Sequence, residues 1–327
     1  MKPKNCLIFG ASGLIGRNLI RKLTQNNFKV TAVTRNIHQK GYLLKTQGNP
    51  GYIEIIGSSI FDENKIRGLI KKADICINLI GILYQKGKIN TFENIHEKFP
   101  KLLSNICKEY NIKQLIHLSA LGIDKAVDSL YAKSKLNGET FIKQNFKEAN
   151  ILRPSVVYSV DDNFTTNLMT LLSWFPIFPL YYKGLTLFKP IHVSDLAEVI
   201  YQIIFRNIKS TTVECIGLEE ISFKNILQRL LKLIGKKRLL IPMPLLVAQS
   251  LAFFLELFPK PLLTLDQLRL LKYQNIPSGQ FKTNFDLGIP SYANFDIEVE
   301  KYSYMWRDGG QFSTGKYVFD NLKNKSS

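Results

Sequence analysis

Short apolar runs alternate with amphipathic stretches along the first half of the chain. Apolar runs rich in β-branched residues are typical of buried strands, whereas apolar positions three and four residues apart predict helices. We expect strands at 6–9, 29–34, 51–56, 75–80, 114–119 and 150–153. Helices are expected at 14–25, 63–72, 92–110 (restarting at Pro100) and 131–146. Because alternating strands and helices form a parallel sheet covered on both faces, the pattern predicts an α/β fold with a doubly wound parallel sheet.

This alternation weakens after Pro154, where prolines and aromatic residues become common. Helical patterns at 245–258 and 265–271 stand there between segments without clear periodicity. We therefore predict two domains and a tail. The first domain comprises 1–160, with its sheet completed by 186–216; the smaller C-terminal domain comprises 217–316 with 161–185, and the flexible tail comprises 317–327.

The composition limits the class of protein. With 45% hydrophobic residues among 327, the chain has enough apolar side chains for a buried core, which excludes a disordered protein. Lysine and arginine number 44 against 26 aspartates and glutamates, and the net charge of +18 suits an anionic membrane surface, an acidic assembly or nucleic acid. The basic residues are scattered and form no arginine-rich arm, so we predict no nucleic-acid partner.

Cysteines and histidines argue against metal sites and disulfides. The four cysteines show no CxxC spacing, and none of the four histidines pairs at i and i+4. We therefore predict no bound metal and a reducing compartment, which places the protein in the cytoplasm.

Two lipophilic stretches, 168–182 and 239–263, are interrupted by prolines. Their apolar runs are shorter than the ~20 residues of a spanning helix, so we expect a chain that does not cross a membrane but is able to lie on one. As a helix, 245–258 would be apolar almost all round, which leaves two interpretations. It is either a core helix or a surface that meets a membrane-embedded complex or a quinone-like lipid, with nearby lysines favouring anionic headgroups.

A glycine-rich turn follows the first strand. Gly10 permits a tight turn, Gly13 lets backbone approach a pyrophosphate, and Gly16 lets the next helix pack on the sheet. The helix N-terminus then presents backbone N–H groups to the anion. An ordinary turn is the alternative, but the strand before and the helix after favour dinucleotide binding by a Rossmann domain. The remaining loop residues that we assign to the cofactor are Ser12, Leu14 and Ile15.

The residue after the second strand discriminates between the two nicotinamide cofactors. NAD sites usually place an acid there, whereas this chain has Arg35. A guanidinium at this position favours the 2′-phosphate of NADP. We predict NADP(H), with NAD(H) and a solvated surface arginine as the alternative.

The spacing GxxGxxG, together with several later motifs, resembles that of extended or atypical short-chain dehydrogenases/reductases. The matching stretches are 78–81 (NLIG), 117–122 (HLSALG), 131–135 (YAKSK), 152–154 (LRP) and 191–195 (IHVSD). Within that superfamily, the segments 263–272 and 307–312 (RDGGQF) most closely resemble the nucleotide-binding accessory subunits of respiratory complex I and their bacterial relatives. The resemblance implies cofactor contacts by Asn78, Ile80, Gly81, Ser119, Tyr131 and Lys135.

Tyr131 and Lys135 lie four residues apart, hence on one face of a helix. In active reductases the tyrosine is the general acid/base, and a nearby ammonium lowers its phenol pKa. The usual Ser or Thr that polarises the substrate carbonyl is replaced by Ala120 and Leu121. Ser119, or Ser129 before the helix, is the candidate substitute. The catalytic candidates are Tyr131, Lys135 and Ser119, and their alternative role is to bind cofactor only.

Two functions from different classes follow. The resemblance implies an accessory or assembly component of NADH:ubiquinone oxidoreductase, with complex I subunits as partners, a structural nucleotide, and a peripheral position on the inner face of the cytoplasmic membrane. The alternative is an NADPH-dependent reductase or epimerase that acts on a sugar- or quinone-like substrate through Tyr131 and Lys135.

Overall fold

The computed structural model describes residues 3–256, 258, 261 and 263–312, and the predicted tail at 317–327 lies outside them. The chain folds into two compact units. Unit 1 contains the described residues up to 155 together with 193–216 and 277–291. Unit 2 contains 156–192, the described residues of 217–276 and those from 292 onward.

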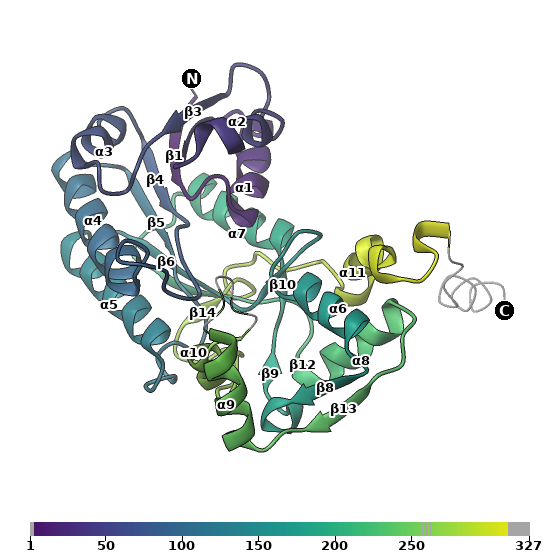
Figure 1. Cartoon of the computed structure of the whole chain (residues 1–327). Helices are drawn as coiled ribbons and strands as arrows, with labels where there is room; N and C mark the ends of the chain where they lie inside the picture. Colours follow the sequence, from purple (N-terminus) through teal and green to yellow (C-terminus); the bar gives the residue numbers. More distant parts are fainter. Residues whose placement is uncertain (1–2, 257, 259–260, 262, 313–327) are drawn as a thin grey trace. The chain divides into compact units, whose positions relative to one another are not determined.

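Unit 1 contains a sheet of eight strands, drawn as arrows in Figure 1, whose pairings are all parallel. From one edge to the other the strands are β14 (Lys282–Thr283), β11 (Thr212–Cys215), β6 (Asn150–Pro154), β5 (Gln114–Leu118), β4 (Ile75–Asn78), β1 (Asn5–Phe9), β2 (Lys29–Thr34) and β3 (Ile53–Gly57). The predicted α/β class with a parallel sheet is confirmed. The chain order reverses between β1 and β4, and a parallel sheet opens a crevice for ligands at the carboxyl ends of such strands.

The sheet extends beyond the strands that the sequence predicted. Lys282 and Thr283, which we assigned to the C-terminal domain, form edge strand β14 beside β11. This strand carries no apolar run that could have signalled it. It is held by pairing, since the Asn284 N–H donates to the Glu214 carbonyl at 3.2 Å. Helix α2 (Ile37–Lys45) was likewise not expected from the sequence.

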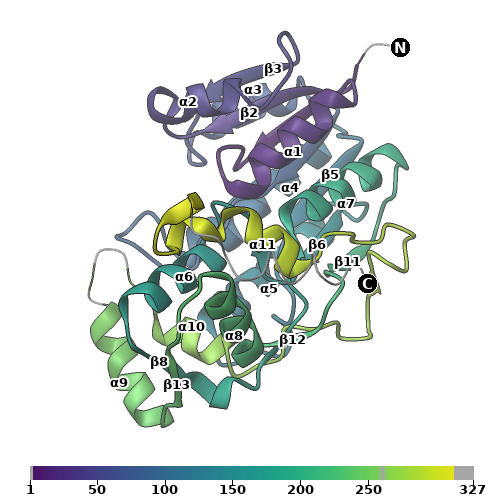
Figure 2. The same ribbon diagram turned by 90° about the vertical axis from the view of Figure 1, so that its right-hand side faces the viewer.

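Helices cover both faces of the sheet (Figures 1 and 2). Helices α1 (Leu14–Gln25) and α7 (Val193–Phe205) pack together on one face. The opposite face carries α3 (Glu63–Ile70), the π-helical segment η1 (Glu93–Lys98), α4 (Phe99–Glu109) and α5 (Leu130–Asn145). The helix expected at 92–110 therefore does restart near Pro100, which lies in the first turn of α4.

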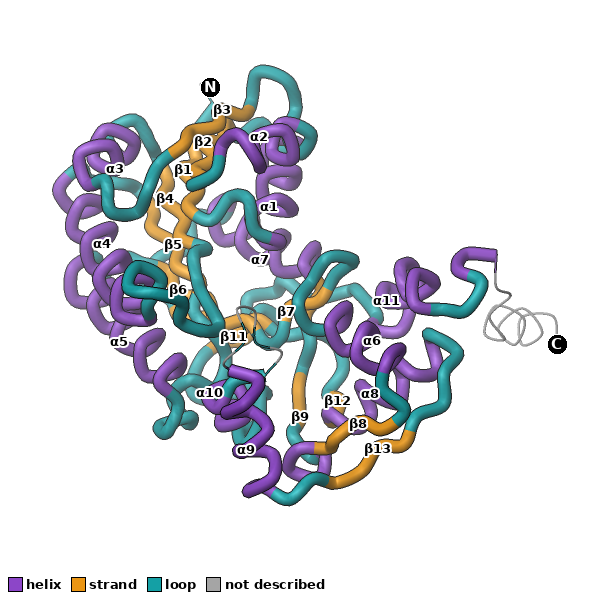
Figure 3. The backbone as a smooth tube through the Cα atoms, in the orientation of Figure 1, coloured by secondary structure: helices purple, strands orange, loops and turns teal. Residues whose placement is uncertain are grey.

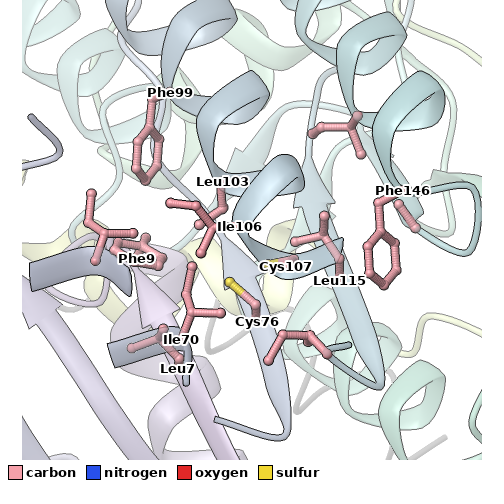
Figure 4. Close-up of a cluster of buried hydrophobic side chains, with 14 of the residues drawn as sticks. Leu7, Phe9, Ile70, Cys76, Phe99, Leu103, Ile106, Cys107, Leu115 and Phe146 are labelled. Carbon is pink, nitrogen blue, oxygen red and sulfur yellow. The ribbon is translucent and has the colours of Figure 1, made fainter. Parts of the chain in front are cut away.

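One core cluster of unit 1 lies between the sheet and the helices α3, α4 and α5 (Figure 4). Leu7 and Cys76 from the strands meet Ile70 of α3 and Ile106 of α4 there, all fully buried. All four cysteines of the chain are buried free thiols. This packing fixes the strand ends from which the candidate site is built.

Unit 2 is assembled from helices and short strand pairs (Figure 3). Its pairs are β7 (Val157–Tyr158) with β10 (Ile191–His192), β8 (Ile177–Leu180) with β13 (Leu239–Pro242), and β9 (Leu187–Phe188) with β12 (Ile221–Ser222). Its helical segments are α6 (Thr165–Trp174), η2 (Tyr181–Gly184), α8 (Phe223–Leu233), α9 (Leu245–Glu256), α10 (Leu265–Leu270), α11 (Phe295–Ser303), η3 (Tyr304–Trp306) and η4 (Gly310–Phe312). A core of α6, α8 and α11 side chains surrounds the fully buried Tyr158.

Candidate functional site

The turn after β1 requires glycine at two positions. Gly10 has a φ of +84°, and a Cβ there would lie 3.0 Å from the carbonyl carbon of Leu79. A Cβ on Gly16 would lie 2.5 Å from the carbonyl oxygen of Ala11, so α1 packs directly on the turn. The Gly13 N–H closes the turn by donating to the Gly10 carbonyl at 3.1 Å. The backbone is thus exposed where a pyrophosphate would bind.

The N-terminus of α1 suits an anion. Gly13 is the N-cap, so no side chain caps this end, and the first turn contains no acidic residue. The N–H groups of Leu14, Ile15 and Gly16 have no intrahelical acceptor at this end of the helix, and the helix dipole adds partial positive charge. Ser12 ties the loop to β2 by accepting a hydrogen bond from the Thr34 hydroxyl at 3.3 Å. These features fit the pyrophosphate of a dinucleotide.

Arg35 stands at the carboxyl end of β2, where the adenosine ribose of a dinucleotide is expected. Its side chain is exposed and donates to the Asn90 amide oxygen at 3.0 Å. Because this partner is neutral, the guanidinium charge remains available. After β3, the buried Ser58 donates its backbone N–H to the Thr34 carbonyl at 3.0 Å.

The turn after β4 is held by buried hydrogen bonds. Asn78 is fully buried, its side-chain oxygen accepts from the Ile80 N–H at 3.1 Å, and its amide nitrogen lies 3.1 Å from His117 Nδ1. Gly81 follows, and a Cβ there would lie 3.2 Å from Lys135 Nζ. The turn predicted to lie beside the cofactor therefore approaches the predicted lysine directly.

Lys135 is the most perturbed cation of the site. Its side chain is 4% exposed and its ammonium donates to the Leu118 carbonyl at 3.0 Å. Burial lowers the Lys135 pKa to about 8, and the negative charge of Glu139 partly opposes that shift. Tyr131 lies one turn earlier on α5, with its ring edge-on to the rings of Phe92 and His96. The predicted helix therefore does carry both residues.

The structure separates the two serines considered as catalytic substitutes. Ser129 caps α5, since its hydroxyl accepts from the Ala132 N–H at 3.1 Å. Ser119 follows β5 and is 4% exposed, and its hydroxyl has no hydrogen-bond partner among the described residues. Ser119 is therefore the one of the two whose hydroxyl no described protein group uses, and it can donate to an oxygen of a bound molecule.

Two histidines also belong to this region, although from the sequence we considered them only as metal ligands. His96 and His117 are both 1% exposed. Burial and the neighbouring ammonium of Lys135 lower the His96 pKa to about 2 and hold the His117 pKa well below its usual value, so both imidazoles are neutral. No cluster of metal-ligating side chains occurs within the described part of the chain. The sequence signal for a buried His117 was its place inside the apolar run 114–118.

Unit 2 presents an apolar surface built on α9. Ala248 and Ala252 are the buried residues of this helix, whereas Leu246, Phe253 and Phe254 are each more than half exposed. The interpretation of 245–258 as a core helix is therefore wrong for its described part. Other large exposed apolar side chains of unit 2 include Trp174, Phe175, Ile177, Leu239, Ile241, Leu245 and Val247.

Helices α9 and α10 and segment η2 also line a hollow of about 460 Å³. Its lining residues include Phe253, Leu268 and Arg269. Across the described residues, every helix is too short or too polar to span a bilayer.

Known proteins resemble this chain in sequence and in fold. A family described as NAD(P)H-binding matches residues 10–205. The mitochondrial NADH-ubiquinone oxidoreductase 40 kDa subunit of Neurospora crassa is 24% identical over 292 residues, which are 88% of this chain and 76% of that protein. The mitochondrial NADH dehydrogenase [ubiquinone] 1 alpha subcomplex subunit 9 of Arabidopsis thaliana is 25% identical over 315 residues, 93% of this chain and 78% of that protein.

Among solved structures, UDP-glucuronic acid 4-epimerase from Bacillus cereus in complex with UDP-glucuronic acid and NAD has a TM-score of 0.68 at 18% identity. The superposition covers 92% of this chain and 99% of that one, and it shows a shared fold. The resemblance drawn from the sequence motifs is confirmed by these matches.

Proposed function

Because this chain belongs to the NAD(P)H-binding family, we propose that it is an NADP(H)-binding accessory or assembly component of NADH:ubiquinone oxidoreductase (complex I). The observation that carries the proposal is the extent of the likeness. The family match ends at residue 205, whereas the two complex I subunits match 88% and 93% of the chain, including most of unit 2. A chain that shared only nucleotide binding with those subunits would resemble them over unit 1 alone.

A structural role for the nucleotide is supported by the residues that follow β5 and by Lys135 of α5. Ala120 and Leu121 stand where a carbonyl-polarising hydroxyl is usual, and Lys135 already donates to a backbone carbonyl. A site that binds the cofactor but polarises a substrate weakly suits a scaffold better than a fast enzyme. The nucleotide would then stabilise unit 1 by binding only its folded state.

The preference for NADP(H) rests on Arg35. In Arg35→Asp, we expect the ratio of NADPH to NADH affinity to fall roughly tenfold to hundredfold, because a charge-assisted hydrogen bond is lost and a like charge is introduced. Fluorescence titration with both nucleotides measures this ratio. Lys45→Asp, an exposed change of the same charge on α2, is the matched control. An unchanged ratio in Arg35→Asp would refute the preference.

The partner surface that we propose is the exposed apolar face of unit 2. Leu246, Phe253 and Phe254 would face the membrane-embedded part of the complex or the anionic surface of the bilayer beside it. Arg238 donates to the Leu172 and Ser173 carbonyls at the end of α6, next to the exposed Trp174. Tryptophan beside a cation is common at membrane interfaces. We therefore propose a position in the cytoplasm, peripheral on the inner face of the membrane, with the α9 hollow admitting a quinone-like molecule.

The function is tested by purifying the affinity-tagged full chain from a mild-detergent extract of its own cells. We expect subunits of NADH:ubiquinone oxidoreductase to co-purify and denaturation to release NADP(H). Deletion of the gene should lower the amount of assembled complex. If no such subunit co-purifies and deletion leaves the assembled complex unchanged, the accessory function is wrong.

The alternative function is an NADPH-dependent reductase or epimerase. It is favoured by Ser119, whose buried hydroxyl has no partner among the described residues, and by the lowered Lys135 pKa near Tyr131. Tyr131→Phe separates the two proposals because it removes only the phenol hydroxyl, which an acid/base catalyst needs. An accessory subunit should retain nucleotide and support assembly as Tyr131→Phe, whereas an enzyme should lose turnover of a sugar- or quinone-like substrate.

A further inference from the structure

The helix that follows the β4 turn is distorted at His96. Pro100 has no N–H for the His96 carbonyl, so an α-helical bond cannot form there. The local bonding is π-helical, with the Phe99 N–H donating to the Asn94 carbonyl. A Cβ on Gly138 of α5 would lie 2.1 Å from the His96 carbonyl oxygen. Pro100 of α4 and Gly138 of α5 therefore bring the His96 backbone against α5. Single π turns of this kind are frequent at functional sites.

The His96 imidazole bridges two elements of the site. Its Nε2 accepts from the Ile82 N–H at 3.1 Å, so the ring proton is on Nδ1. Nδ1 then donates to the Ser134 hydroxyl at 2.9 Å, and that hydroxyl donates to the Tyr131 carbonyl at 2.8 Å. Each donor in this series of hydrogen bonds has an acceptor only while His96 is neutral. A pKa of about 2 keeps it neutral throughout the physiological range.

The bridge lies beside the amine of Lys135. A Cβ on Gly81 would lie 3.2 Å from Lys135 Nζ and 3.8 Å from His96 Nε2. The His96 ring is also edge-on to the Tyr131 ring, with centroids 5.4 Å apart, and is stacked on Phe92 at 5.3 Å. One neutral ring therefore contacts the turn after β4 and the first turn of α5.

We propose that His96 is a positioning residue of the nucleotide site, which holds the 81–82 turn against α5 so that Lys135 can receive the nicotinamide ribose. This inference rests on the proposed binding of NADP(H). The role is one of placement, because both ring nitrogens are already engaged by protein groups, Nε2 by the Ile82 N–H and Nδ1 by the Ser134 hydroxyl. It differs from the roles of Tyr131 and Lys135, whose polar ends would touch the cofactor.

Three substitutions separate the two hydrogen bonds of the ring. His96→Gln can keep the acceptor for Ile82, His96→Asn can keep the donor to Ser134, and His96→Phe keeps only the stacking. We expect the Kd for NADPH to rise roughly tenfold in His96→Phe and less in the two amide variants. His38→Phe, on the exposed face of α2, is the matched control and should bind as the wild type does.

The pH profile of binding distinguishes placement from mere stability. The titratable groups around the Lys135 amine are Glu139 on the same helix, which is charged, and the imidazoles of His117 on β5 and His96 on η1, which are neutral. Wild-type affinity should fall as the pH rises through about 8, because the Lys135 pKa lies there. In His96→Phe a displaced turn would let water reach the amine, so the midpoint should move upward.

Each outcome decides the inference. A higher Kd together with a shifted midpoint in His96→Phe supports it, whereas a lower melting temperature with unchanged Kd and midpoint overturns it. If His96→Phe does not fold, the NADPH affinities of His96→Asn and His96→Gln are compared with that of the wild type instead. Wild-type affinity in both variants would overturn the inference. If the wild type itself binds neither NADPH nor NADH, the proposed function fails as well, which distinguishes the two failures.

Discussion

Unit 1 buries polar side chains at its site, whereas unit 2 exposes apolar ones on α9. Lys135, His96 and Asn78 are at most 4% exposed, and burial of a charge without a partner is costly. Leu246 and Phe254 show the opposite departure, with 79% and 63% of their surfaces exposed. Both regions contradict the rule that apolar residues lie inside and polar residues outside.

The buried polar side chains of unit 1 and the exposed apolar side chains of α9 differ in how they are stabilised. In unit 1 the side chains of Lys135, His96 and Asn78 are hydrogen-bonded within the unit, whereas the Ser119 hydroxyl has no partner among the described residues. This region is therefore completed by the fold and by a small ligand. On α9 the exposed aromatic rings gain nothing from the fold of unit 2 itself. The first region is therefore built to hold a molecule inside it, whereas the second is built to be covered from outside.

The largest effect should come from the ion pair behind Lys135. Arg153 donates twice to Glu139, at 2.8 Å each, and both side chains are at most 3% exposed. Glu139→Ala leaves the guanidinium buried without its partner, so we expect the free energy of unfolding to fall by about 3–5 kcal/mol. Denaturant unfolding measures it. Glu148→Ala, which breaks the exposed pair with Lys209, should cost less than about 1 kcal/mol. Equal losses of stability in Glu139→Ala and Glu148→Ala would contradict the difference expected between a buried and an exposed ion pair.

The pH dependence of stability tests the buried ammonium. The Lys135 pKa is lowered from 10.5 to about 8, so between these values the unfolded chain binds more protons and stability rises with pH. Relative to Lys135→Met, the wild type should gain on the order of 3 kcal/mol from pH 8 to 10.5. NADPH affinity should fall over the same range, because the ammonium is lost. If the difference in the free energy of unfolding between the wild type and Lys135→Met stays constant over this pH range, the buried charge is ruled out.

Gly16→Ala tests whether the first turn is made by close backbone approach. The new Cβ would lie 2.5 Å from a backbone oxygen, so α1 must move, at a cost of about 1–3 kcal/mol. NADPH affinity should fall roughly tenfold or more as the helix N-terminus shifts. Gly68→Ala on α3, where nothing lies within 4 Å, should instead stabilise the protein by about 0.5–1 kcal/mol. Thermal unfolding and nucleotide titration compare the two variants.

The smallest effect on stability should come from α9. Phe253→Ser and Phe254→Ser should change the free energy of unfolding by less than about 0.5 kcal/mol, because both rings are more than half exposed. The same variants should bind anionic vesicles and the respiratory complex more weakly. Leu172→Ala in the core of unit 2 should cost about 2–5 kcal/mol without affecting either partner. A large loss of stability in the α9 variants would mean that this surface is covered by the chain itself.

Much of unit 1 was predictable because its signals are local. The strand β2 and the helix α1 have the bounds that the pattern indicated, since β2 is a continuous buried run after Lys29 and α1 buries one face. The strand at 75–80 ends two residues early because the Asn78 side chain turns the backbone at Ile80. The glycine turn was also readable, since the crowding at Gly10 and Gly16 comes from a few neighbouring peptide groups.

The sequence by itself determined the α/β class, the nucleotide-binding turn and the pairing of Tyr131 with Lys135 on one helix, because each depends on residues close together in the chain. Only the tertiary structure decided that β14 extends the sheet, that Ser129 is a helix cap while Ser119 is not, and that His96 bridges two elements. It also decided the exposure of α9, since a helix apolar all round has no periodicity to show which side is covered. Burial and hydrogen-bond partners come from distant segments, and a local pattern does not contain them.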